Sequence, residues 1–144
     1  MNVECFFDTN VLVYAVGRLA ADEPKRQRAL ELLMPANFGT SGQVLQEFFV
    51  TVTRKIKKPL STEHAAEWID RLAIRPVVAI DEDIVKSAIG ISRRHRISYW
   101  DAAILAAAER LGAPILYTED LNHDQVYGSV RVVNPFAPLE PRPN

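Results

Sequence analysis

Short apolar runs alternate with segments of helical periodicity along most of this 144-residue chain. Apolar runs this short fit strands that are buried on both faces of a sheet. Strands that alternate with helices are joined by right-handed crossovers, which makes the strands parallel and covers both faces of the sheet. The expected strands are residues 3–7, 37–41, 76–80 and 115–117, with a weaker one at 130–133. The pattern therefore predicts an α/β fold, a three-layer α/β/α sandwich with a central parallel sheet.

Residues that cap helices stand at the start of several helical segments. The side-chain oxygens of Ser, Thr and Asp can accept hydrogen bonds from the free N–H groups of a first helical turn. The candidate caps are Ser41, Ser61 or Thr62, Asp81 and Ser98. We therefore expect helices over residues 11–16, 24–35, 43–57, 62–73, 81–91 and 99–111.

The composition is that of an ordinary globular protein, with 48% hydrophobic and 24% charged residues. A chain of this length can bury one sizeable core without disulfides or structural metals. The last residues are rich in proline, which favours an extended segment. We expect one domain over residues 1–136 and a proline-rich tail over residues 137–144.

The single cysteine, Cys5, lies in an apolar run, so we expect a buried thiol in a reducing compartment. No apolar stretch approaches the length needed to cross a bilayer. Residues 1–4 also lack the basic start of a secretion signal. These features predict a cytoplasmic protein that makes no contact with a membrane.

The net charge of −1 argues against a protein that coats nucleic acid through bulk charge. Any contact with nucleic acid must therefore be local. Two basic runs are candidates, Arg54–Lys58 and Arg93–Arg96. Such runs usually serve as solvated helix ends, and contact with a polyanionic substrate is the alternative.

Four carboxylates stand where a packed segment would favour other residues. Asp8 and Asp120 follow expected strands, and the carboxyl ends of parallel strands meet at one edge of a sheet. Glu47 borders the apolar face of its helix, and Asp101 begins the apolar stripe of another. Each acid alone also fits a turn, a helix cap or a surface ion pair. Together they predict a shared acidic site.

Carboxylates that converge in a partly desolvated cleft repel one another unless a cation or a proton offsets their charge. A divalent metal ion is the simplest remedy. Oxygen ligands without a nearby Cys or His cluster favour Mg²⁺ or Mn²⁺ over Zn²⁺. The acidic site is therefore expected to bind one of these two ions.

Four blocks of this sequence resemble the PIN-domain ribonucleases, in particular the VapC-type toxins of bacterial toxin–antitoxin pairs. The blocks are Phe7–Leu12, Val44–Phe48, Tyr99–Ile104 and Leu116–Asp120. Their order and spacing extend over nearly the whole chain. The resemblance implies an acidic site of Asp8, Glu47, Asp101 and Asp120, which act as catalytic and metal-binding residues and are supported by the polar residues Asn10 and Thr118.

The same resemblance implies cleavage of single-stranded RNA by an endoribonuclease that depends on Mg²⁺ or Mn²⁺. In similar toxins the carboxylates hold the metal and orient the attacking water. Such toxins are usually homodimers that are silenced by a cognate antitoxin, whose tail lies across the active cleft. The register of the fourth acid stays open among Glu119, Asp120 and Asp124, and the family pattern of Thr, any residue and then Asp favours Asp120.

Two other functions remain possible from the sequence. An inactive PIN-like module could bind RNA or a protein partner without cleaving anything. The segment Asp8–Val11 also resembles the nucleophile loop of haloacid dehalogenase-type phosphatases. That loop needs a second Asp two positions after the first, and this chain has Asn10 there, which weakens the phosphatase interpretation.

Overall fold

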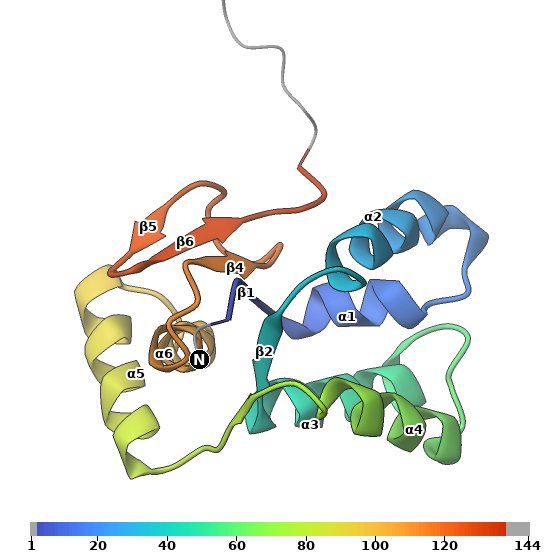
Figure 1. Ribbon diagram of the computed structural model, residues 1–144, viewed down its shortest axis with the longest axis horizontal. Helices are drawn as coiled ribbons and strands as arrows, with labels where there is room; N and C mark the ends of the chain where they lie inside the picture. The colour runs from blue at the N-terminus through green and yellow to red at the C-terminus, as the bar shows by residue number, and fades with distance from the viewer. Residues whose placement is uncertain (1–2, 138–144) are drawn as a thin grey trace, which may run out of the picture.

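A six-stranded sheet runs through the middle of the computed structural model, which describes residues 3–137 (Figure 1). The strand order is β3-β2-β1-β4-β6-β5. The strands are β1 (Cys5–Phe7), β2 (Phe38–Ser41), β3 (Val77–Val78), β4 (Ile115–Tyr117), β5 (Val126–Tyr127) and β6 (Val130–Val133). All neighbouring pairs are parallel except β5 and β6, which are antiparallel. The sandwich expected from the sequence is confirmed, with one antiparallel strand at its edge.

Six α-helices cover the two faces of this sheet. Figure 1 shows α5 and α6 on one side of the strands and the other four helices on the opposite side. The helices are α1 (Thr9–Val16), α2 (Glu23–Leu33), α3 (Gly42–Val50), α4 (Thr62–Leu72), α5 (Glu82–His95) and α6 (Tyr99–Arg110). Within residues 3–137, no helix has the length and apolar character required to cross a bilayer.

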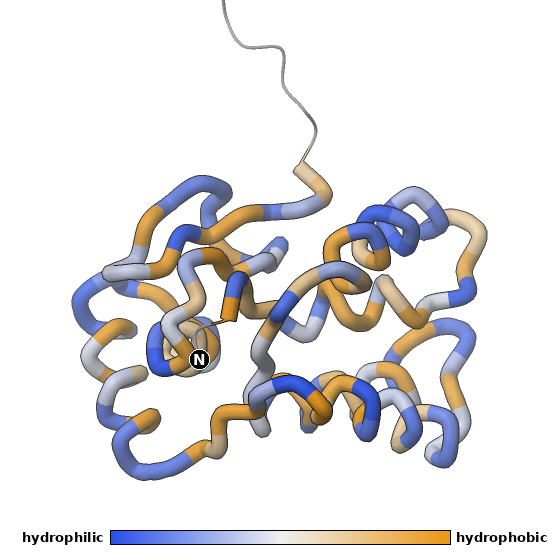
Figure 2. Tube along the Cα trace, viewed as in Figure 1, coloured by the Kyte–Doolittle hydropathy of each residue, from blue (hydrophilic) through white to orange (hydrophobic). Residues whose placement is uncertain are grey.

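The core lies where α6 packs on β2, β4 and β6, around the central strand β1. Phe6 and Phe7 of β1 are fully buried, and so is Leu116 of the neighbouring β4. Every residue of α6 from 102 to 108 is buried, because its many alanines let the helix fit between the sheet and α5. Along the helices, hydrophobic residues alternate with hydrophilic ones, as helices with one buried face require (Figure 2). Cys5 is buried as expected, and burial raises the pKa of its thiol to about 11.

The expected helix caps are confirmed at four positions. Ser41, Ser61, Asp81 and Ser98 each accept a hydrogen bond from the backbone N–H three residues later. Ser61, and not Thr62, caps α4. These caps satisfy N–H groups that a helix leaves free at its start. Local sequence therefore determines where the helices near the acidic residues begin.

Three expectations from the sequence need correction. The helix expected over residues 43–57 ends as α3 at Val50 and continues as a five-residue π-helical turn, η2 (Thr51–Lys55). The Thr53 hydroxyl donates to the Phe49 carbonyl at 2.7 Å, and the three β-branched residues 51–53 fit a regular helix poorly. The strand expected over residues 76–80 has only two residues, and β5 was not expected at all.

The tail predicted for residues 137–144 falls outside the described residues except for its first residue, Ala137. The structure shows the polypeptide only up to that point. The proposed division between the domain and its tail therefore stays a prediction.

The cap of α3 offers a test of how this helix is held. Ser41 is buried, and its Oγ accepts from the Val44 N–H at 3.2 Å. We expect Ser41→Ala to lower the free energy of unfolding by about 1 kcal/mol, because the N–H of Val44 loses its partner. Urea denaturation measures this change. The control is Ser129→Ala in an exposed turn, and an equal loss in both variants would contradict the assigned role of Ser41.

Candidate active site

Asp8 sits at the junction between β1 and α1, where a buried strand turns directly into a helix. Its carboxylate caps α1 by accepting a hydrogen bond from the Thr9 N–H at 2.7 Å. The residue is only 5% exposed. A carboxylate with so little contact with water is costly to keep ionised, so its surroundings decide its protonation state.

Thr118 connects three of the polar residues expected at the site. β1 and β4 are parallel neighbours, with Phe7 opposite Tyr117, so the residues that follow both strands emerge at the same edge. The Thr118 hydroxyl donates to Asp8 Oδ2 at 2.8 Å. It also accepts from the Asp120 N–H at 3.0 Å and from Asn10 Nδ2 at 3.4 Å. One buried hydroxyl therefore orders both acids that follow the strands.

Glu47 is held by two neighbours that the sequence interpretation did not single out. Thr9 Oγ1 donates to its Oε2 at 3.0 Å, and Gln43 Nε2 donates to its Oε1 at 3.1 Å. The same Gln43 nitrogen lies 3.2 Å from the carbonyl oxygen of Trp100, the residue before Asp101. These contacts link α3 to α1 and to the start of α6. The alternative ion pair of Glu47 with Arg54 or Lys55 is absent among residues 3–137.

Asp101 occupies the first turn of α6, where its N–H donates to the Ser98 hydroxyl at 3.1 Å. Its charge acts on Asp120. Partial burial, followed by the nearby charge of Asp101, raises the pKa of Asp120 above its usual value. The helix-cap explanation of this segment is therefore correct for its backbone, yet the Asp101 carboxylate also contributes to the acidic region.

The pKa of Asp8 is raised to about 6. Burial is the largest cause, and the charges of Asp120 and Glu47 raise it further. The hydrogen bonds from Thr118 and Thr9 act in the opposite direction and lower it. The structure thus brings all four expected acids into one region in which each additional negative charge is unfavourable.

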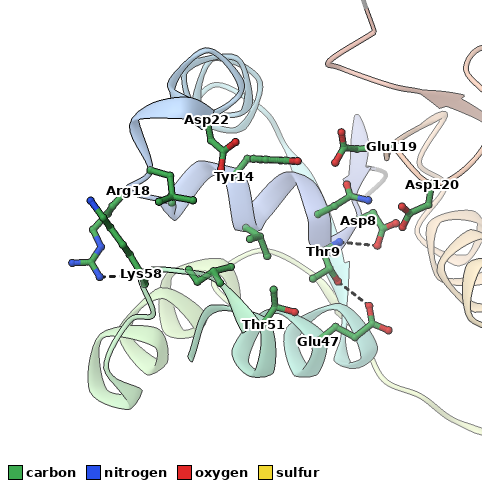
Figure 3. Close-up of a pocket in the computed structure, with 15 residues that line it drawn as sticks. Asp8, Thr9, Tyr14, Arg18, Asp22, Glu47, Thr51, Lys58, Glu119 and Asp120 are labelled. Carbon is green, nitrogen blue, oxygen red and sulfur yellow. Dashed lines mark hydrogen bonds between the residues drawn. The ribbon is translucent and has the colours of Figure 1, made fainter. Parts of the chain in front are cut away.

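A cavity of about 420 Å³ opens beside these acids (Figure 3). Asp8, Glu47 and Asp120 line one end, whereas Arg18 and Lys58 line the other. The wall between the two ends is partly apolar, with residues from α1 and from the segment after η2. We call this cavity the first hollow. Asp101 is not part of its lining and acts on it from the side of Asp120.

The structure separates the three candidates for the fourth acid. Glu119 forms an ion pair with Lys25 at 3.0 Å, so its charge is already balanced. Asp124 has a positive φ of 67° and pairs with His123, and it does not line the first hollow. The charge of Asp120 raises the pKa of Asp8, and the charge of Asp101 raises the pKa of Asp120. Its position agrees best with the register chosen from the sequence.

The residues present fit a hard divalent ion. The donors are carboxylate oxygens, and Asn10 Oδ1 is buried without a hydrogen-bond partner beside them. Within residues 3–137, no three acidic, His or Cys side chains converge into a ready-made metal cage. Mg²⁺ does not need one, since it usually keeps several waters and binds one or two carboxylates together with substrate phosphates.

The sequence interpretation missed three residues that position the acids, namely Thr9, Gln43 and Lys25. Gln43 lies four residues before Glu47 on the same helix face, and this spacing alone could have indicated the contact. Thr9 follows Asp8 directly, but its bond to Glu47 spans 38 positions of the sequence. The bond between Lys25 and Glu119 spans 94 positions. No local pattern could have indicated these last two contacts.

The family model of the PIN domain matches residues 5–129. Since this match covers most of the 144 residues, the chain belongs to the PIN-domain family. The membership replaces the haloacid dehalogenase-type interpretation of Asp8–Val11. No curated protein matches the chain by sequence.

Solved structures share the fold over most of this chain. A toxin–antitoxin complex from Klebsiella pneumoniae matches with a TM-score of 0.68 and 21% identity, covering 92% of this chain and 98% of the other. VapC20 from Mycobacterium tuberculosis, a sarcin–ricin loop cleaving toxin, gives 0.63 and 22%, covering 81% and 89%. VapBC2 from Rickettsia felis, bound to a DNA fragment from its promoter, gives 0.59 and 19%, covering 89% and 96%.

The raised pKa of Asp8 predicts how stability depends on pH when divalent ions are absent. A folded-state pKa of about 6, against an ordinary value of 3.8, stabilises the fold below pH 4. That contribution, about 3 kcal/mol, is lost as the pH rises through 6. We expect Asp8→Asn to lack this loss. Urea denaturation in EDTA from pH 4 to 7 compares the two proteins, and parallel pH profiles would contradict the burial of an ionisable Asp8.

Proposed function

We propose that this chain is a metal-dependent endoribonuclease that cleaves phosphodiester bonds of single-stranded RNA. The observation that carries the proposal is the burial of Asp8 beside Asp120 at the common end of two parallel strands. No cation pairs with Asp8 among the described residues, although two further acids lie close to it. A protein keeps such an arrangement at a cost in stability, which favours a functional origin.

Asp8, Glu47, Asp101 and Asp120 would hold Mg²⁺ or Mn²⁺, and some of them would act through water. When bound, such an ion lowers the pKa of an attacking water and offsets the charge on the phosphate under attack. Among the described residues, the lining of the first hollow offers carboxylate, hydroxyl and amide oxygens and no Cys or His, which favours these hard ions over zinc. Asn10 and Thr118 would support the acids, because they contact Asp8 and Asp120 through the same hydroxyl.

The chain itself supplies position and charge. Thr118 and Thr9 fix both oxygens of Asp8, so its carboxylate points in one direction. Gln43 and Thr9 fix Glu47 in the same way. A carboxylate held this firmly can orient a water for in-line attack on phosphorus without first losing conformational freedom. Because the pKa of Asp8 is raised to about 6, its carboxylate can also hold a proton near that pH when no metal is bound.

The toxin role rests on the family and on the kind of proteins that share the fold. Among the structures with this fold, one is a toxin–antitoxin complex and another is a sarcin–ricin loop cleaving toxin. We therefore propose that the chain is the toxin of such a pair, with a cognate antitoxin as its partner. We also propose that the chain forms a homodimer and acts in the cytoplasm. The charge of the acidic end of the first hollow suits a basic side chain of an antitoxin, which would compete with the metal.

A PIN-like module without activity is the second candidate function. It would bind RNA or a protein through the first hollow. All four acids are present and lie in one region, which favours an active enzyme over such a module.

Metal-dependent cleavage tests the enzyme directly. We expect the wild-type protein to cut a 5′-labelled single-stranded RNA in MnCl₂ or MgCl₂ and to lose this activity in EDTA. Asp8→Asn and Asp120→Asn should each lower kcat by about 100-fold or more, because a group that stabilises transition-state charge has effects of this size. The readout is the rate of product formation on a denaturing gel.

Asp124→Asn is the matched control for these variants, because Asn tolerates the positive φ of this exposed turn. It should cleave like the wild type. Circular dichroism and thermal unfolding check that each variant is folded. Equal, metal-independent cleavage by all four proteins would reject the proposed site, and no cleavage by any of them would favour the binding module.

A further inference from the structure

Two hollows include residues of the acidic region. The first hollow runs from Asp8 to Lys58. A second hollow of about 380 Å³ ends at Lys55. Three residues line both hollows, namely Thr9, Glu47 and Thr51. The two hollows therefore share Glu47 and its neighbours, and each contains a different lysine.

The π-helical turn η2 sends the two lysines into separate hollows. The Ile56 N–H donates to the Thr51 carbonyl at 3.2 Å, which closes the wide turn. Ile56 then leaves the turn in an extended conformation. As a result Lys55 faces the second hollow, whereas Ile56 and Lys58 line the first. In a regular α-helix, positions three apart would lie on the same face.

Neither lysine is neutralised by an acid. Lys55 and Lys58 are exposed and belong to no ion pair among residues 3–137. By contrast, Lys86 pairs with Glu82 at 2.9 Å. Arg18 donates to the carbonyl of Lys58 at 3.3 Å, so it holds the chain at this position (Figure 3). These two cations are therefore available to a ligand.

The far end of the first hollow is positively charged overall. Arg18 and Lys58 line it together with a single acid, Asp22. Between this end and the acids, Val13 and Ile56 form an apolar wall. A ligand that extends from the acids toward Lys58 would meet an apolar surface and then a cation. A sugar with its base followed by a phosphate has this sequence of properties.

We infer that Lys55 and Lys58 bind two different phosphates of the same RNA, neither of them the one that is cleaved, each lysine in its own hollow. This inference rests on the nuclease function proposed above and assigns two new contacts to it. A polynucleotide carries one charge per nucleotide, so phosphates that flank the reacting one must pass the acids at short range. A cation in each hollow offsets that repulsion. The net charge of the chain is −1, so such cations must act locally.

Salt-dependent binding tests the two contacts. Asp8→Asn in EDTA serves as the background, so that RNA binds without being cut. Fluorescence anisotropy with a labelled single-stranded RNA gives the slope of log K against log salt concentration. Lys55→Ala and Lys58→Ala should each reduce the slope by about 0.7, and the double variant by about 1.4. Lys57→Ala is the matched control, since this lysine lies in the same basic run but lines neither hollow.

An unchanged slope in the Lys55 and Lys58 variants would overturn the inference, and so would an equal reduction by Lys57→Ala. If these variants instead turned a dimer into a monomer on size exclusion while the slope stayed constant, the lysines would belong to a protein interface. This result is distinguishable from failure of the nuclease function, because cleavage by the protein with Asp8 intact is measured separately. If the protein with Asp8 intact cleaved no RNA but the lysine variants gave the expected slopes, the two phosphate contacts would be supported. The chain would then be an RNA-binding module and not a nuclease.

Discussion

The burial of one carboxylate, that of Asp8, is the constraint on which the site depends. The residue ends a fully buried strand and begins a helix, so its side chain has little access to water. Two hydrogen bonds to its oxygens favour the charged form, yet burial and two neighbouring acids raise its pKa to about 6. The fold therefore holds a carboxylate whose charge is only partly compensated. A divalent ion bound at this point would relieve a cost that the free protein carries.

The fold brings distant residues to this carboxylate through its parallel strands. The pairing of β1 with β4 aligns Asp8 with Thr118, although 110 positions separate them in the sequence. Helix α3 carries Glu47 to the same edge, and Gln43 joins it to the start of α6. After the π-helical turn at the end of α3, Lys55 and Lys58 line two different hollows that both include Glu47. The fold and the site therefore depend on the same chain connections, those that bring β1, β4 and α3 to one edge of the sheet.

The sequence predicted the sandwich and most helix starts, because these follow from local signals, and it named four acids that the structure brings into one region. A cap such as Ser98 acts within three residues, and an acid after a buried strand stands out against its neighbours. It did not predict the π-helical turn or the two-residue strand β5, where contacts outweigh weak propensities. It favoured Asp120 over Glu119 only through the family pattern. The bond of Glu119 to Lys25, 94 positions away, and the bond of the Asp120 N–H to Thr118 distinguish the two in the structure.

The central claim is that these acids tolerate their proximity by sharing a divalent ion. Anomalous diffraction at the manganese absorption edge, from crystals of the wild-type protein soaked in MnCl₂, tests this claim most directly. We expect a strong anomalous peak within direct coordination distance of an Asp8 oxygen, on the side that faces Asp120. Manganese peaks found only at other carboxylates, with none beside Asp8, would contradict it.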